Sequence, residues 1–181
     1  MKHLLLFLIS FSFMVSCKPQ EARRPESVQS GSFIKQSAER NKKLIAKERT
    51  KIESIIEQNP ELEYFASENG FWYTYQNKVE QDTIQPEFGD SINFDYNVQD
   101  LNGKIIYSKN QIGNKDYVME KEILFSGLRE GLKLMKPSEQ VTFIFPSQVA
   151  YGYYGDDNKI GTNVPIICEV TLNTITQNNN D

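Results

Sequence analysis

One change of pattern, at Asn59-Pro60, most constrains what this chain can fold into. Before it, residues 34–58 contain no proline or glycine, and their isoleucines and alanines recur at helical spacing. After it, many apolar residues alternate with polar ones, as in half-buried strands. A proline also disfavours helix at the residue that precedes it. The sequence therefore predicts a helix over residues 34–59, followed by a mostly β domain over residues 60–181.

Aromatic and alternating segments in this second part predict about five strands. They lie at residues 71–75, 91–99, 104–108, 140–145 and 165–175. One amphipathic helix is predicted over residues 123–135, and a short helix at residues 61–67. A long loop at residues 150–164 is rich in glycine, tyrosine and aspartate. The expected fold class is α+β, with an antiparallel sheet and one packed helix.

The N-terminus has the pattern of a secretory signal. A basic start precedes an apolar run, residues 4–15, which is too short to span a bilayer as a helix. The run ends in Met14-Val15-Ser16-Cys17, which resembles a bacterial lipobox. We expect a lipoprotein signal peptide over residues 1–16, with Cys17 lipidated; a soluble secreted protein with an incidental cysteine is the alternative. The protein would then be lipid-anchored to a bacterial membrane in the cell envelope, facing the periplasm.

Residues 17–33 are polar and lack a hydrophobic period, so they are expected to form a flexible tether. The helix after them has a thin apolar stripe, which leaves three arrangements open: docking on its own domain, homodimerisation through residues 34–58, or a loosely held spacer. Charge also divides here, because residues 18–58 carry ten basic and six acidic side chains. This basic neck is either ordinary solvated helix charge or a contact with an anionic membrane surface.

Histidine and cysteine are scarce, and this limits the chemistry. The only histidine, His3, lies in the expected signal peptide, which excludes Ser-His-Asp and Cys-His nucleophiles and histidine-ligated metal sites in the mature protein. Cys17 and Cys168 are too far apart for a zinc knuckle. Cys168 is expected to be a buried apolar residue, with a reactive thiol as the alternative. The net charge of −4 argues against a nucleic-acid partner; no metal or cofactor is expected.

Three stretches resemble the FKBP-type peptidyl-prolyl isomerases. Residues 89–96 read Gly-Asp-Ser-Ile-Asn-Phe-Asp-Tyr and precede an Asn-Gly turn. Residues 123–132 read Ile-Leu-Phe-Ser-Gly-Leu-Arg-Glu-Gly-Leu, with Met135 beyond. Residues 145–152 read Phe-Pro-Ser-Gln-Val-Ala-Tyr-Gly and precede Ile160-Gly161-Thr162-Asn163-Val164-Pro165-Ile166. The order and spacing match over residues 71–175. The Tyr153-Tyr154 pair and the tethered N-terminus are similar to the FKBP-type lipoproteins associated with gliding motility in Bacteroidetes.

This resemblance implies an antiparallel sheet wrapped around a short helix, with an apolar pocket between them. It implies catalytic roles for Tyr96, for the Phe125 backbone N–H and for the Tyr151 hydroxyl. The other implied substrate-binding residues are Ile106, Tyr107, Tyr117, Leu124, Leu128, Ile160 and Cys168. Such an enzyme breaks no bond and needs no imidazole, because it only favours the twisted state of an X-Pro amide.

The chain departs from the family pattern at several pocket positions. Tyr107 stands where the family has an aspartate, and Leu128 where it commonly has tryptophan. Ile106 and Cys168 replace phenylalanines. We therefore expect a pocket with fewer aromatic rings and no carboxylate, which could weaken catalysis.

The leading hypothesis is a prolyl isomerase that acts on proline-containing unfolded or partly folded proteins. It would assist the folding of extracytoplasmic proteins, with motility or secretion components as candidates. The alternative is a non-enzymatic chaperone or assembly factor on the same scaffold, and a structural lipoprotein without pocket function is a third reading.

Overall fold

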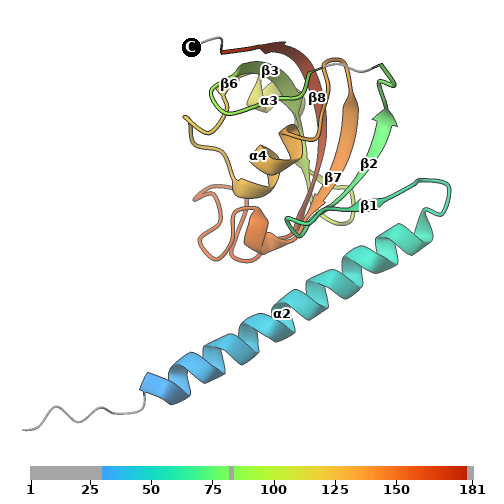
Figure 1. The fold of residues 1–181 in the computed structure, drawn as a ribbon. Coiled ribbons are helices and arrows are strands. Elements are labelled where there is room, and N and C mark those ends of the chain that lie inside the picture. The colour runs from blue at the N-terminus through green and yellow to red at the C-terminus, as the bar shows by residue number, and fades with distance from the viewer. Residues whose placement is uncertain (1–29, 82–83, 179–181) are drawn as a thin grey trace, which may run out of the picture. The chain divides into compact units, whose positions relative to one another are not determined.

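The computed structural model describes residues 30–81 and 84–178 of the 181-residue chain (Figure 1). The expected signal peptide, Cys17 and the tether up to residue 29 lie outside the described residues. Contacts divide the chain into two units, Met1–Glu39 and Arg40–Asp181. The second unit contains the whole β domain and residues 40–58 of the preceding helix, which is about five turns.

The long helix α2 spans Ser30–Gln58 and starts four residues before the predicted position, so residues 30–33 are helical and not tether. It ends at Gln58, one residue before the predicted end, and the Asn59 backbone N–H donates to the Ile56 carbonyl (3.1 Å). Glu48 and Ile52 are buried, which shows that the second half of α2 docks on its own domain. Among the described residues, no helix combines the length and apolar character needed to cross a membrane.

The described strands form a single antiparallel sheet, as expected from the alternating pattern. In chain order they are β1 (Phe65–Ala66), β2 (Trp72–Asn77), β3 (Ser91–Tyr96), β4 (Val98–Gln99), β5 (Ile105–Tyr107), β6 (Lys115–Val118), β7 (Gln140–Phe145) and β8 (Ile166–Thr176). The order across the sheet is β1-β2-β7-β8-β3-β6, with β4 joined to both β5 and β8. Long β8 is therefore central and brings distant segments side by side.

Two expectations on local structure need correction, and three further elements were not predicted. The short helix predicted at residues 61–67 is wrong, because Phe65 pairs with Tyr73 in the sheet and stacks on its ring (5.4 Å between centroids). The packed helix α4 spans only Ser126–Leu132, since the Phe125 backbone before it is extended. Strand β6, helix α3 (Lys109–Ile112) and the 3₁₀ helix η2 (Ser147–Val149) had no sequence signal that we recognised.

Helix α4 packs closely on strand β7 and lies within the curve of the sheet (Figure 1). Two glycines on one helix face allow this approach. A Cβ at Gly127 would lie 2.6 Å from the Phe145 ring, and one at Gly131 would lie 2.8 Å from the Phe143 ring. The core of the domain forms in this interface, where Phe143, Phe145 and Leu128 are fully buried.

Candidate active site

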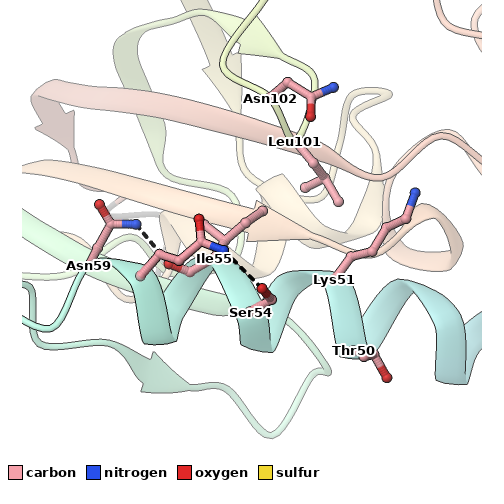
Figure 2. A pocket seen from close by; sticks show the side chains of 8 residues that line it. Thr50, Lys51, Ser54, Ile55, Asn59, Leu101 and Asn102 are labelled. Atoms are coloured by element: carbon pink, nitrogen blue, oxygen red, sulfur yellow. Dashed lines mark hydrogen bonds between the residues drawn. The ribbon is translucent and has the colours of Figure 1, made fainter.

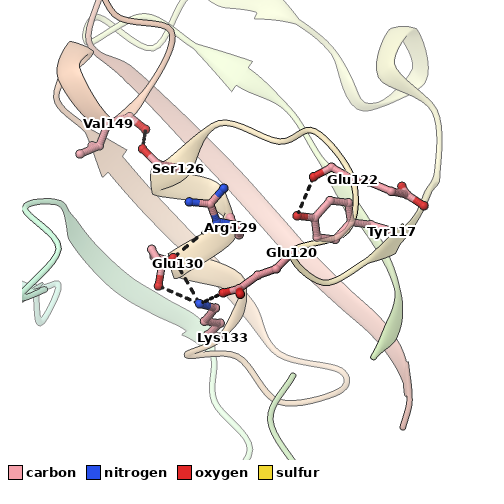
Figure 3. Close-up of polar contacts among 8 residues, drawn as sticks. All are labelled: Tyr117, Glu120, Glu122, Ser126, Arg129, Glu130, Lys133 and Val149. Carbon is pink, nitrogen blue, oxygen red and sulfur yellow. Dashed lines mark hydrogen bonds and ion pairs between the residues drawn. The ribbon is translucent and has the colours of Figure 1, made fainter. Parts of the chain in front are cut away.

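Strand alternation places one group of predicted site residues on the inner face of the sheet. Tyr96 ends β3, and its ring stacks on Phe94 with centroids 5.6 Å apart. Tyr117 of β6 meets the same Phe94 edge-on at 6.4 Å. Its hydroxyl donates to the Glu122 carbonyl (3.3 Å), which holds the segment leading to α4 (Figure 3). Cys168 of β8 is fully buried among these side chains.

The start of α4 supplies a second group. Leu128 is fully buried, whereas Leu124 and Phe125 are partly exposed. The Phe125 ring contacts Phe145 edge-on (5.4 Å) and Tyr151 at a tilt (5.0 Å). Among the described residues, the Phe125 backbone N–H has no protein acceptor. The Phe125 carbonyl accepts the backbone N–H of Arg129. Phe125 therefore presents both an aromatic face and an available donor.

Tyr151 belongs to a loop that hydrogen bonds hold in a fixed turn. The Ser147 carbonyl accepts the backbone N–H of Ala150 (3.1 Å) and of Gly152 (2.8 Å), one on each side of Tyr151. The Ser126 hydroxyl donates to the Val149 carbonyl (3.3 Å) and links this turn to α4 (Figure 3). The turn therefore directs Tyr151 toward Phe125.

Farther along the same loop, Gly155 and Asp156 close a second turn. Gly155 has φ +74°, and a Cβ there would lie 2.1 Å from the Ile160 carbonyl, so a side chain does not fit. The Asp156 N–H donates to that carbonyl (3.0 Å), and its carboxylate accepts the Ile160 N–H (2.7 Å). This closed turn keeps Ile160 buried in the hydrophobic cluster that contains Tyr96, Tyr117, Phe125 and Tyr151. We call these four rings the aromatic cluster.

Asp156 also brings a carboxylate to Tyr107, the position where the family pattern has an aspartate and this chain does not. The Tyr107 hydroxyl donates to the Asp156 carboxylate, and it accepts the Lys159 backbone N–H (3.2 Å). The Lys159 ammonium lies over the Tyr107 ring, 4.8 Å from its centroid. Sequence reasoning missed Asp156, because only the folded loop brings it to Tyr107.

Burial sets the protonation of the site. It raises the pKa of Tyr96 to about 12, against an opposing hydrogen bond with Tyr151, and it also raises the pKa of Tyr151 above its ordinary value. Both hydroxyls therefore remain protonated donors near neutral pH. Burial likewise raises the pKa of the Cys168 thiol, which supports the buried apolar reading over the reactive one.

Burial alone would raise the pKa of Asp156, but hydrogen bonds from Tyr107 and from the Ile160 and Asn158 amides hold it below its ordinary value. The carboxylate is therefore ionised at neutral pH. It contributes a negative charge beside the Tyr107 ring, over which the Lys159 ammonium also lies.

One contiguous hydrophobic cluster contains all ten residues that the sequence motifs singled out. The five buried residues are Tyr96, Tyr117, Leu128, Ile160 and Cys168. The five partly buried residues are Ile106, Tyr107, Leu124, Phe125 and Tyr151. They come from four strands, helix α4, the segment just before α4 and the loop between β7 and β8. Within the described residues, no group of three or more histidine, cysteine or acidic side chains lies close enough to hold a metal ion.

Comparison with known protein families shows which family the chain belongs to. The family described as FKBP-type peptidyl-prolyl cis-trans isomerase matches residues 82–173, just over half of the chain and the whole span of the ten residues. The chain belongs to this family. It is therefore a peptidyl-prolyl cis-trans isomerase of the FKBP type.

Solved structures share the FKBP fold with this chain. A peptidyl-prolyl cis-trans isomerase from Pseudomonas syringae pv. tomato has a TM-score of 0.59 at 19% identity, with 75% of this chain and 96% of that chain covered. FkpA from Escherichia coli has a TM-score of 0.60 at 20% identity, with 97% of this chain and 82% of that chain covered. A comparison with curated protein sequences gives no match.

A separate hollow of about 770 Å³ lies between the end of α2 and the turn that joins β4 to β5 (Figure 2). Six of its eight lining residues have polar side chains and none is aromatic: Thr50, Lys51, Ser54, Ile55, Gln58, Asn59, Leu101 and Asn102. An apolar proline ring requires apolar walls. This hollow has no aromatic wall to offer a proline ring.

Proposed function

We propose that this protein is a membrane-anchored prolyl isomerase that assists the folding of extracytoplasmic proteins. The convergence of Tyr96, Phe125 and Tyr151 carries the enzymatic part of this proposal. The N-terminal pattern ending in Cys17 supports the anchor. Residues 17–29 of the expected tether would let the domain reach chains that emerge near the membrane.

The chemistry follows from what the site offers an X-Pro amide. Rotation about this bond has a barrier of about 18–20 kcal/mol, because resonance keeps the amide planar and charge-separated. An apolar environment disfavours that planar form, and donors that fit only the twisted amide lower the barrier further. We assign these donors to the Tyr151 hydroxyl and the Phe125 N–H, with Tyr96 and Ile160 enclosing the proline ring.

The other implied residues complete this enclosure. Leu128 would form its floor, and Leu124, Tyr117, Ile106 and Cys168 its apolar walls. Tyr107 would act at the rim through Asp156, whose carboxylate it binds.

Isomerisation of peptides with several different residues before proline tests the enzymatic proposal. We expect the mature protein to accelerate the reaction, with the largest rate for apolar preceding residues, which suit the aromatic cluster. A folded protein that gives no rate above the uncatalysed background would contradict it.

The anchor needs its own experiment. Expression in a bacterial host with lipoprotein processing should yield a mature chain that begins at an acylated Cys17 and sediments with membranes. The Cys17→Ser variant should be released into the soluble fraction. Unmodified Cys17 in the wild-type protein would favour the soluble secreted alternative.

Motility or secretion components are the client class we propose, on the basis of the likeness to gliding-motility lipoproteins in the Tyr153-Tyr154 pair. The two rings are 70% and 86% exposed and meet edge-on at 5.5 Å. Crosslinking from position 154 in cells would identify the clients. Recovery of only cytoplasmic proteins would exclude this class.

The same exposed tyrosines favour a chaperone role as the second candidate function, because exposed aromatic rings bind unfolded chains without chemistry. Suppression of aggregation by a Phe125→Ala variant that has lost isomerase activity would support it.

Homodimerisation through residues 34–58 would add a second binding surface. Sedimentation of the full mature chain tests this, since a monomer at micromolar concentration excludes it.

A further inference from the structure

Helix α2 places one buried carboxylate that the isomerase chemistry above does not use. Glu48 is 5% exposed and lies outside the part of the chain that the FKBP family matches. One carboxylate oxygen accepts the Ser147 backbone N–H (2.9 Å), and the other accepts the Ser147 hydroxyl (2.7 Å). A buried carboxylate is costly unless such donors satisfy it, so this contact is strongly specified.

Ser147 is also the residue that organises the turn around Tyr151. It is 2% exposed, and its carbonyl accepts the amides of Ala150 and Gly152 on either side of that tyrosine. Ser147 thus donates to the Glu48 carboxylate through its N–H and hydroxyl, and it holds the Tyr151 turn through its carbonyl. The Gly152 carbonyl in turn accepts the Asn163 N–H (2.8 Å), which ties in the far end of the loop.

Helix α2 also has an apolar contact with the domain. Ile52, one turn farther along α2, is fully buried and already docks the helix by apolar burial. Glu48 instead contacts the loop at Ser147, whose carbonyl accepts backbone amides on both sides of Tyr151.

We propose that Glu48 is a positioning residue of the isomerase site, acting through Ser147 on Tyr151. The helix that precedes the FKBP domain is then part of the catalytic apparatus and not only a connection to the membrane. This inference rests on the catalytic role proposed for Tyr151. If Tyr151 has no catalytic role, we still expect the Glu48 contact to keep the Ser147 turn ordered.

The experiment compares three variants of the full mature chain. Glu48→Ala removes the carboxylate, and Glu48→Gln keeps one acceptor. Glu53→Gln is the matched control, because it makes the same chemical change on the same helix at a side chain that is 46% exposed. The readouts are kcat/KM on an X-Pro peptide and the hydrogen-exchange rates of the Ala150 and Gly152 amides.

We expect Glu48→Ala to lower kcat/KM about fivefold to tenfold, mainly through kcat, because a small misplacement of a catalytic group is costly. Exchange at Ala150 and Gly152 should accelerate by a similar factor. Glu48→Gln should show the same changes at a smaller size, and it decides the matter if Glu48→Ala does not fold. The Glu53→Gln variant should match the wild type in both readouts.

A double-mutant cycle with Ser147→Ala adds a readout that a purely structural role of Glu48 would not change. If Glu48 acts through Ser147, the losses in kcat/KM from Glu48→Gln and Ser147→Ala should be less than additive. Folded Glu48 variants with wild-type kcat/KM and wild-type exchange would overturn the proposal, as would equal losses in Glu53→Gln. An inactive wild type would instead refute the proposed catalysis, and the exchange rates would still test the contact.

Discussion

The two sides of the candidate site are built in different ways. Tyr96, Cys168 and Leu128 lie on strands and a helix, and burial in the core fixes them. Tyr151 and Ile160 lie on the loop between β7 and β8, where amides, a carboxylate and glycines fix them. The first side therefore depends on packing and the second on hydrogen bonds and backbone conformation. Mutations should separate the two by affecting stability on one side and activity on the other.

The largest effect should come from the packed side. Phe143→Ala removes a fully buried ring that contacts Phe71, Tyr73 and Phe145, and it should lower the free energy of unfolding by about 3–5 kcal/mol. Urea denaturation measures this. Tyr154→Ala, at a side chain that is 86% exposed, is the control and should stay within about 0.5 kcal/mol of the wild type. Equal losses in the two variants would contradict the assignment of the core.

Gly155→Ala should be the most damaging change in the loop. The new Cβ meets the Ile160 carbonyl, and φ +74° is strained for alanine, so we expect a cost of about 1–3 kcal/mol. Because Ile160 must move, kcat/KM should fall about tenfold or more. Gly152→Ala is the control, since φ is also positive there but no atom lies within 4 Å of its Cβ. Equal activity in the two variants would show that the Gly155 contact is unimportant.

Phe125 joins the two sides, because its ring contacts both Phe145 and Tyr151. Phe125→Ala should lower kcat/KM by at least about tenfold, since it removes an aromatic wall and loosens Tyr151. Peptide isomerisation assays measure this loss. Phe125→Leu keeps the apolar volume and should recover part of the activity, and full activity in Phe125→Ala would remove this residue from the site.

The same division explains which features the sequence predicts. Alternation placed Phe94 and Tyr96 on one face of a strand, and helical spacing identified Leu128 as buried, because both are local patterns with a fixed period. Asp156 and Glu48 were missed because their partners, Tyr107 and Ser147, lie 49 and 99 positions away in the chain. No local period reports such a contact.

Loss of the Asp156 charge at low pH should weaken the loop and leave the core intact. The folded chain holds the pKa of Asp156 below its ordinary value, so the ionised form stabilises the loop above the unfolded pKa of about 3.9. That contribution is lost as the pH falls through the lower, folded pKa. Amide exchange at Ile160 should rise over this acidic range in the wild type. In Asp156→Asn it should be faster at neutral pH and vary less with pH, and identical profiles would contradict this role.

The smallest effect should be Tyr151→Phe, which removes one hydroxyl and keeps the ring against Phe125. One hydrogen bond contributes about 0.5–1.5 kcal/mol, so kcat/KM should fall only about threefold. The loss should appear in kcat, because we assign this donor to the twisted amide and not to the ground state. The raised pKa of Tyr151 predicts no change in activity with pH near neutrality from this group. A loss confined to KM would mean that Tyr151 binds the substrate uniformly, and the turn that Ser147 holds would then position a binding residue and not a catalytic one.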